Sequence, residues 1–210
     1  MREVEIWYDV VCPYAYLGST QIERVAREAG AVVRWEPFLL GGVFVALGVP
    51  ANLAASLPEA KQRHNARDLE RWADWFGVPL AWPDGHPRRT VLAMRAILAA
   101  GSERAAATHA LYRAYWVEGA DVSDPAVVRE VLDRAGLDGA ACVERASDPE
   151  IKAELRRQTD RALERGIFGA PTFFVGGEMF WGQDRLDFVA GALRASAPDD
   201  QSRTYSNSKG

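Results

Sequence analysis

The sequence contains few of the residues that form disulfide frameworks and metal centres. Only two cysteines, Cys12 and Cys142, and three histidines occur among 210 residues. The histidines His64, His86 and His109 have no metal-ligand spacing, so we predict no metal site. Two cysteines allow one disulfide, but a chain of this length without a secretory signal rarely needs one. The apolar helical surroundings of Cys142 favour a buried thiol.

An excess of positive charge is also missing. The chain has 25 Lys and Arg against 29 Asp and Glu, a net charge of −4, and no basic stripe. We therefore predict neither a nucleic-acid partner nor an anionic membrane surface as partner. No apolar run is long enough to span a bilayer, and the first residues lead directly into a strand pattern. We expect a cytoplasmic protein with one large domain, or a small domain that carries an insertion.

What the sequence does contain is a strand–helix–strand pattern in its first forty residues. Apolar and polar residues alternate over 4–8, which is typical of a strand. Helical spacing of apolar residues follows over 22–29 and stops at Gly30. A second strand is predicted over 32–36, and Pro37 ends it. The connection is long enough for the two strands to be parallel.

The middle of the chain is predicted to be helical. Capping-box patterns begin at Ser56 and at Ser147, and each of them precedes a helix. Two further helices are expected over 90–100 and 102–118, each followed by glycine. Another helix is expected to begin at Pro125.

The end of the chain returns to strands. Two short strands, 172–175 and 178–181, are joined by Gly176-Gly177. That pair suits a tight hairpin turn with positive φ at both glycines. A last amphipathic helix is expected over 186–193, and the polar segment 196–210 is expected to be a disordered tail.

In this order the elements predict an α/β fold. A β-α-β unit in 1–40 and an α-β-β-α unit in 147–195 form one core, and an all-helical insertion domain, 41–146, interrupts it. This is the element order of a thioredoxin-like fold with a helical insertion.

Cys12 stands where the first predicted strand ends and the first predicted helix begins. A side chain at that place faces unpaired N–H groups at the positive end of the helix. We therefore expect the Cys12 thiol to ionise more easily than a free cysteine. Thioredoxin-like folds place their active cysteine in this way. Ala15 stands where a dithiol oxidoreductase has its second cysteine, so this site has one sulfur.

A second motif, Gly169-Ala170-Pro171, directly precedes the hairpin. In thioredoxin-like folds a cis proline at this place faces the start of the active-site helix. The residue before it offers backbone N–H and C=O groups to a peptide-like ligand, in the manner of an added strand. We therefore predict a cis bond between Ala170 and Pro171, close to Cys12.

Three segments together resemble the 2-hydroxychromene-2-carboxylate isomerase family: CPYAYL at 12–17, GIFGAPTF at 166–173 and FWGQDRL at 180–186. That family is a relative of the kappa-class glutathione transferases within the wider DsbA-like group. The resemblance covers about residues 3–195. It implies glutathione as cofactor, a homodimer, and a thioredoxin core with a helical insertion.

The resemblance also implies a glutathione site made of Cys12, Asn52, Lys61, Ala170, Pro171, Gln183 and Asp184. Lys61 would pair with the glycyl carboxylate of glutathione, with help from Asn52. The backbone of Ala170 would bond to the cysteinyl part. Gln183 and Asp184 would hold the γ-glutamyl end, with Asp184 facing its amine.

Each of these residues also has a purely structural interpretation. Asp184 could cap the last helix, and Lys61 could be a solvated surface lysine. Asn52 could shape a loop, and Pro171 could be structural only. Cys12 itself could be a small buried residue.

The sequence leaves three functions open. The first is a glutathione-dependent isomerase that acts on a small aromatic or electrophilic substrate. Cys12, where the family carries serine, would then stabilise the glutathione thiolate, and Trp82 or Trp181 could line the substrate pocket. In the second, Cys12 reacts covalently, as in a monothiol thiol–disulfide oxidoreductase or a kappa-type transferase. The third is a non-catalytic module that binds an extended peptide across Ala170 and Pro171.

Overall fold

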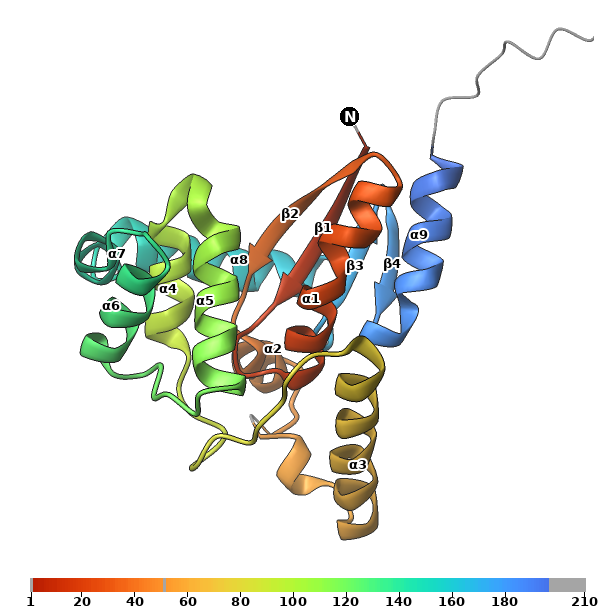
Figure 1. The fold of residues 1–210 in the computed structure, drawn as a ribbon, viewed down its shortest axis with the longest axis horizontal. Coiled ribbons are helices and arrows are strands. Elements are labelled where there is room, and N and C mark those ends of the chain that lie inside the picture. Colours follow the sequence, from red (N-terminus) through yellow and green to blue (C-terminus); the bar gives the residue numbers. More distant parts are fainter. Residues whose placement is uncertain (1, 51, 197–210) are drawn as a thin grey trace, which may run out of the picture.

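The computed structural model describes residues 2–50 and 52–196, which form a four-stranded mixed sheet with helices on both faces (Figure 1). The strand order is β2-β1-β3-β4. β1 (Arg2–Tyr8) is parallel to β2 (Ala31–Pro37) and antiparallel to β3 (Thr172–Val175), and β4 (Glu178–Trp181) pairs with β3 in the antiparallel direction. The central strand β1 therefore ends beside the start of β3, because these two strands run in opposite directions.

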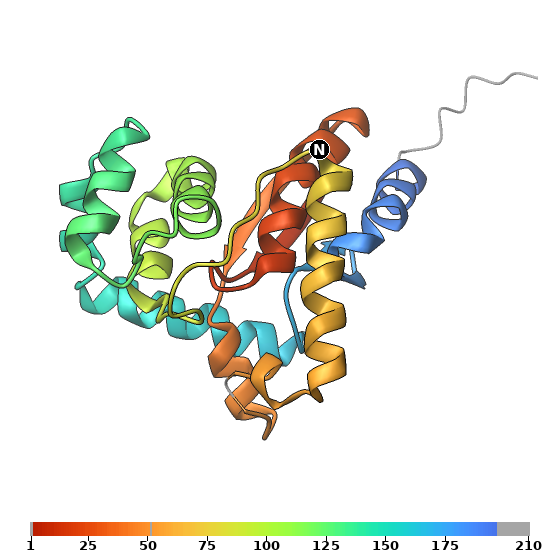
Figure 2. The same cartoon turned by 60° about the horizontal axis from the view of Figure 1, so that its bottom comes forward.

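The helices are α1 (Pro13–Glu28), α2 (Leu40–Ala46), α3 (Glu59–Phe76), α4 (Val91–Ala99), α5 (Arg104–Trp116), α6 (Pro125–Arg134), α7 (Gly139–Arg145), α8 (Pro149–Glu164) and α9 (Leu186–Ala195). Short 3-10 turns are η1 (Ala54–Ser56), η2 (Gly101–Glu103) and η3 (Gln183–Arg185). Helices α1 and α9 cover one face of the sheet and α8 crosses the other (Figure 1). Helices α4 to α7 form a group beside β2, and α3 stands apart from them, as Figure 2 shows.

The predicted α/β fold with a thioredoxin-like core and a helical insertion is confirmed. α1 forms the crossover that makes β1 and β2 parallel. The limits given above, 1–40 and 147–195 for the core and 41–146 for the insertion, stay a prediction. α2 was not expected, because Gly41 and Gly42 lower the helix propensity of its first turn.

The second half of β1 is buried on both faces, although its sequence suggested one polar face. Ile6 and Tyr8 lie under α1, and Trp7 is fully buried on the opposite face. The guanidinium groups of Arg161 and Arg165 on α8 lie 5.4 and 5.5 Å from the centre of the Trp7 ring. This cation–π arrangement on an apolar ring anchors α8 to the sheet.

Both capping-box predictions are wrong. Pro58 is the N-cap residue of α3 and Asp148 that of α8, and neither helix has a side-chain cap bond. The Ser56 hydroxyl instead donates to the Leu53 carbonyl at 2.7 Å within η1. The helix predicted to begin at Pro125 does so, and its N-cap aspartate accepts a bond from a backbone N–H.

The hairpin between β3 and β4 is confirmed, but with a different turn. Gly176 has a φ of +60°, whereas Gly177 has no positive φ. Only the first of the two central residues therefore needs glycine, as in a type II′ turn.

The described part of the chain ends just after α9. The Ser196 hydroxyl donates to the Leu193 carbonyl at 3.0 Å. The rest of the predicted tail, 197–210, lies outside the described residues. Within 2–50 and 52–196, no helix combines the length and the apolar character that a membrane crossing requires.

Candidate functional site

The two motifs singled out in the sequence meet in the structure. Cys12 is the N-cap residue of α1, with extended backbone angles, and Pro13 begins the helix. The Cys12 thiol donates a hydrogen bond to the Ala170 carbonyl, with 3.1 Å between Sγ and O. The bond between Ala170 and Pro171 is cis, as predicted. Segments 158 positions apart therefore form one site at the end of the sheet.

A close approach of α1 to the cis-proline loop supports this contact. A Cβ atom added to Gly18 would lie 3.2 Å from both Pro171 Cγ and Phe173 Cζ. Glycine at this place lets the first turns of α1 pack directly on the start of β3.

The expectation of an easily ionised Cys12 is wrong. Cys12 is 6% exposed, and burial raises the pKa of its thiol to about 12. The backbone N–H groups of Ala15 and Tyr14 at the helix start act in the opposite direction, and the nearby charge of Asp9 adds to the increase. Loss of solvation outweighs the helix terminus here because the thiolate would have to form in the interior. Cys12 is thus a protonated thiol and a hydrogen-bond donor at neutral pH.

Asn52 lies just before η1, and Lys61 lies in the first turn of α3. Both are exposed, and Asn52 Oδ1 accepts a bond from Ala55 N at 3.2 Å, which shapes the start of η1. Lys61 has no ion pair within 2–50 and 52–196, and it lies near the start of α3. That end of α3 is the one farther from α1 in both views (Figures 1 and 2). No hydrogen bond joins either residue to Cys12 in the described part of the chain, and their ligand roles stay predictions.

Gln183 and Asp184 lie beside the cis proline. The N–H of Gly182 donates to the Pro171 carbonyl at 3.0 Å, which attaches η3 to the proline loop. Gln183 is buried, and the exposed Asp184 carboxylate contacts Arg185 Nη2 at 3.2 Å. Asp184 does not cap α9, because the N-cap residue is Arg185 and the helix has no side-chain cap bond. The structural interpretation of Asp184 is therefore wrong, and its carboxylate remains available at the surface.

Sequence reasoning missed Tyr14 and Asp68. Tyr14 is half-buried directly after Pro13, and burial raises the pKa of its phenol to about 12, with further contributions from the charges of Asp68, Cys12 and Asp184. Asp68 on α3 and Asp184 on η3 thus act on the same phenol. Both stand close to predicted site residues in the sequence, Tyr14 within the CPYAYL segment and Asp68 seven positions after Lys61, but neither was assigned a role.

Of the two tryptophans considered for a substrate pocket, Trp181 lies against the loop before Pro171, whereas Trp82 reaches the backbone before Cys12 only through Trp116. The half-exposed Trp181 packs on Phe168 with 5.0 Å between ring centres. A Cβ atom on Gly169 would lie 2.5 Å from the Trp181 indole nitrogen. Trp82 packs edge-on against Trp116, and the Trp116 indole N–H donates to the carbonyl of Val10 at 2.8 Å.

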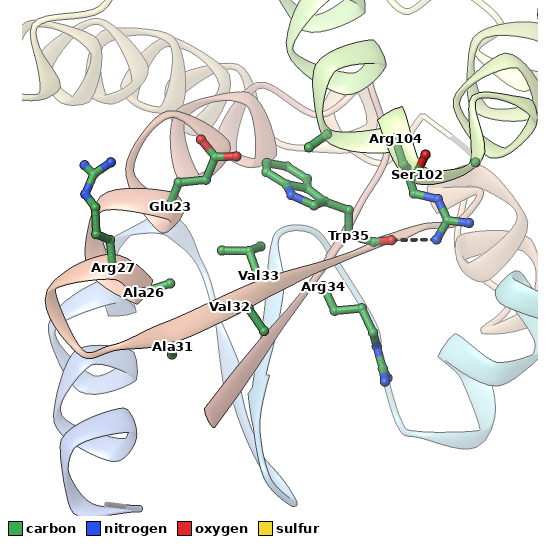
Figure 3. A pocket seen from close by; sticks show the side chains of 12 residues that line it. Glu23, Ala26, Arg27, Ala31, Val32, Val33, Arg34, Trp35, Ser102 and Arg104 are labelled. Atoms are coloured by element: carbon green, nitrogen blue, oxygen red, sulfur yellow. Dashed lines mark hydrogen bonds between the residues drawn. The ribbon is translucent and has the colours of Figure 1, made fainter. Parts of the chain in front are cut away.

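A hollow of about 440 Å³ lies elsewhere, at the free edge of β2 (Figure 3). It is bordered by Glu23 and Arg27 from the second half of α1, by Trp35, and by Arg104, which donates to the Trp35 carbonyl at 3.0 Å. Cys12 stands at the opposite end of α1, so this hollow is not part of the Cys12 site.

The second cysteine lies away from the Cys12 site, on α7. Cys142 on α7 is a buried free thiol, as expected. Among residues 2–50 and 52–196, no three His, Cys, Asp or Glu side chains are placed to hold a metal ion.

Comparisons with known proteins agree with this geometry. Residues 3–194 match the family described as a DSBA-like thioredoxin domain. A 2-hydroxychromene-2-carboxylate isomerase of Sphingobium xenophagum is 32% identical over 91% of this chain and 98% of that protein. Glutathione S-transferase kappa 1 of Homo sapiens is 26% identical over 91% of each chain.

A solved structure shows the same likeness in three dimensions. A 2-hydroxychromene-2-carboxylate isomerase superposes with a TM-score of 0.80 at 29% identity, over 91% of this chain and 94% of that chain. Together with the Cys12–Ala170 contact and the cis proline, these matches show that the chain belongs to the DSBA-like thioredoxin-domain family, in which its relatives include 2-hydroxychromene-2-carboxylate isomerases and kappa-class glutathione transferases.

Proposed function

We propose that this protein is a glutathione-dependent isomerase of the 2-hydroxychromene-2-carboxylate type. The observation that carries the proposal is the hydrogen bond from a protonated Cys12 thiol to the Ala170 carbonyl, at the start of α1. When glutathione binds, the thiol can turn its single proton from the Ala170 carbonyl to a second sulfur, as a serine hydroxyl would, and the freed carbonyl can accept a bond from the cysteinyl N–H of the tripeptide. The resemblance to the isomerases, at about 30% identity over nearly the whole chain, supplies the reaction type.

In this proposal the glutathione thiolate lies against the start of α1. The Cys12 S–H and the backbone N–H groups of Tyr14 and Ala15 face it, and such fixed donors favour the charged form of a bound sulfur. The backbone of Ala170 bonds to the cysteinyl part of the tripeptide, beside Pro171, in the manner of an added strand.

The two ends of glutathione are assigned by charge. Asp184, with Gln183 beside it, receives the γ-glutamyl amine. Asp68 adds a second carboxylate, since its charge and that of Asp184 both act on the Tyr14 phenol. Lys61 and Asn52 receive the glycyl carboxylate. Because Lys61 lies at the far end of α3, this last assignment requires the glycyl end to reach toward η1 and the start of α3.

The proposed reaction consumes no second reagent. The hemiketal ring opens first: its hydroxyl loses a proton, the ring C–O bond breaks, and the phenol oxygen takes up a proton, which leaves a conjugated ketone. The thiolate then forms a C–S bond to the electrophilic alkene carbon beside the aromatic ring, and the displaced electron pair moves to the ketone oxygen. The former double bond becomes a single bond and rotates. The electron pair then returns, the C–S bond breaks, and glutathione leaves unchanged with the ring-opened benzylidenepyruvate isomer. Trp181 and Trp82 are proposed to contact the aromatic ring.

Titration calorimetry with glutathione tests the binding site. Lys61→Ala and Asp184→Ala are each expected to weaken binding by roughly tenfold or more, about 1.4 kcal/mol, because each removes a charged partner. Lys152→Ala and Asp187→Ala are matched controls, since both residues are exposed and lie outside the proposed site. Unchanged affinity in both site variants would remove this assignment.

Turnover of 2-hydroxychromene-2-carboxylate with and without glutathione tests the reaction. Turnover that requires glutathione, with no glutathionyl group on Cys12 by mass spectrometry after treatment with oxidised glutathione, is the expected result. A stable adduct on Cys12 would favour the covalent alternative, against which the raised pKa of its thiol argues. Absence of any glutathione-dependent turnover, together with capture of a peptide, would favour the binding module.

We also propose, on the resemblance alone, that the protein is a cytoplasmic homodimer. Sedimentation velocity measures its oligomeric state.

A further inference from the structure

Asp9 is a buried carboxyl group three residues before Cys12, and the proposed reaction does not use it. It is 2% exposed at the end of β1. Its Oδ1 accepts hydrogen bonds from Thr90 Oγ1 at 2.7 Å and from Val11 N at 3.2 Å, and its Oδ2 accepts one from Leu40 N at 2.9 Å. All three of these partners donate to the carboxylate, which is the arrangement that suits its ionised form.

The donors come from separate segments of the chain. Val11 belongs to the loop that carries Cys12, Leu40 begins α2, and Thr90 immediately precedes α4. The main-chain carbonyl of Asp9 also accepts bonds from Cys12 N at 3.0 Å and from the Tyr112 hydroxyl on α5 at 3.2 Å. One residue therefore connects the Cys12 loop to three elements of the helical insertion.

The ionisable groups that face Asp9 and Cys12 are phenols: Tyr8 from β1, Tyr14 from α1, and Tyr112 and Tyr115 from α5. Burial raises the pKa of each of these phenols, so all stay neutral around pH 7. α2 has no ionisable side chain, and α4 contributes the Thr90 hydroxyl at its start. The charges of Asp68 and Asp184 act on the Tyr14 phenol. Within 2–50 and 52–196, no cation forms an ion pair with Asp9.

Burial raises the pKa of the Asp9 carboxyl, while bonds from Thr90, Leu40 and Val11 hold it down. A carboxylate kept in this way beside Cys12 repels a thiolate, since two like charges close together in the interior are costly.

We propose that Asp9 is a positioning residue for Cys12. Its carboxylate fastens the Cys12 loop to the helical insertion and keeps the Cys12 thiol in the protonated form that donates a hydrogen bond. Only the expected effect of Asp9 on turnover rests on the proposed function, because the protonation state of the Cys12 thiol can be measured without glutathione.

The test follows the Cys12 Cβ carbon by ¹³C NMR with labelled cysteine, in a Cys142→Ala background that leaves one cysteine signal. The parent protein is expected to show almost no thiolate at about pH 10, in line with the raised pKa of its thiol. Asp9→Asn, which keeps the shape and removes the charge, is expected to increase the thiolate fraction at that pH by about tenfold.

Two control variants separate the effect of the Asp9 charge from the effect of a loosened Cys12 loop. Glu36→Gln removes another buried carboxylate, bonded to Gln158 on α8 rather than to the Cys12 loop, and is expected to leave the thiolate fraction unchanged. Tyr112→Phe removes one bond to the Asp9 carbonyl without removing a charge, and is also expected to leave it unchanged. An increase in Tyr112→Phe equal to that in Asp9→Asn would overturn the proposal, because loosening alone would explain both.

A parent-like thiolate fraction in a folded Asp9→Asn variant would also overturn it. If Asp9→Asn does not fold, Asp9→Ser decides, since it also removes the charge and keeps a small polar side chain. A similar increase in the thiolate fraction is expected there, and no increase would count against the proposal. Glutathione affinity is measured on the same proteins. If the parent protein binds no glutathione but the Cys12 thiolate fraction still increases in Asp9→Asn, the proposed function is refuted and this inference stands.

Discussion

At the scale of single residues, the state of Cys12 results from two opposing effects. The start of α1 favours a thiolate, and burial opposes it. Burial prevails, and the pKa of the thiol rises to about 12. A thiol in this state is a poor nucleophile at neutral pH but a competent donor, which is why we assign Cys12 the role of stabilising another sulfur.

Substitutions of Cys12 test this assignment. Cys12→Ser is expected to keep glutathione-dependent turnover within a few fold, because a hydroxyl donates at least as well as a thiol. Cys12→Ala is expected to reduce turnover by roughly a hundredfold, the usual effect of losing one donor to a developing anion. Steady-state kinetics on both variants provide the measurement. Complete loss of turnover in Cys12→Ser would instead indicate that the sulfur reacts covalently.

The sequence was sufficient to predict where Cys12 and Pro171 lie, because strand, helix and hairpin patterns are local. It was not sufficient to predict the state of the thiol. That state depends on solvent exclusion by elements far along the chain and on the charge of Asp9, which no motif marks. Asp68 was missed for the same reason, since it reaches the surroundings of Tyr14 from a separate helix.

At the scale of secondary-structure elements, the contact between β4 and the loop before β3 depends on a missing side chain. Gly169→Ala places a Cβ atom 2.5 Å from the Trp181 indole nitrogen, which cannot be accommodated without displacing that ring. We expect a loss of about 1–3 kcal/mol in the free energy of unfolding, as overpacking usually causes. Urea unfolding measures it.

Gly177→Ala is the matched control in the neighbouring hairpin. A Cβ atom there meets nothing within 4 Å, and Gly177 has no positive φ. Its stability is expected to stay close to that of the parent. Equal stability of Gly169→Ala and Gly177→Ala would show that Trp181 does not need the position seen here.

Element ends were harder to predict from sequence than the elements themselves. The Ser56 pattern fits a capping box, yet the Ser56 hydroxyl donates to the Leu53 carbonyl beside η1. This local hydrogen bond takes the place of a cap on α3. Similarly, two glycines marked the hairpin correctly, but only Gly176 uses the freedom that glycine provides.

At the scale of the whole molecule, buried acidic groups couple stability to alkaline pH. Burial raises the pKa of Cys12 from 9.0 to about 12 and that of Tyr14 from 10.0 to about 12. Above about pH 9 the unfolded chain therefore releases protons that the folded chain retains, so stability falls as pH rises. The stabilisation is fully present below the unfolded values and is lost as pH rises through the folded ones.

For Cys12 alone this corresponds to roughly 2 kcal/mol between about pH 8 and about pH 10.5, at about 1.4 kcal/mol per pH unit. Urea unfolding of the parent and of Cys12→Ser at these two pH values is the measurement. The parent is expected to lose more stability than the variant, which has no thiol to titrate. Equal losses would mean that Cys12 ionises alike in the folded and unfolded chains.

The most direct test of the whole account is a crystal structure of the protein with reduced glutathione. We expect the glutathione sulfur within hydrogen-bond distance of Cys12 Sγ and the N–H groups that begin α1, with the tripeptide backbone paired to Ala170. A disulfide between the two sulfurs, or glutathione bound away from the Ala170–Pro171 loop, would contradict it.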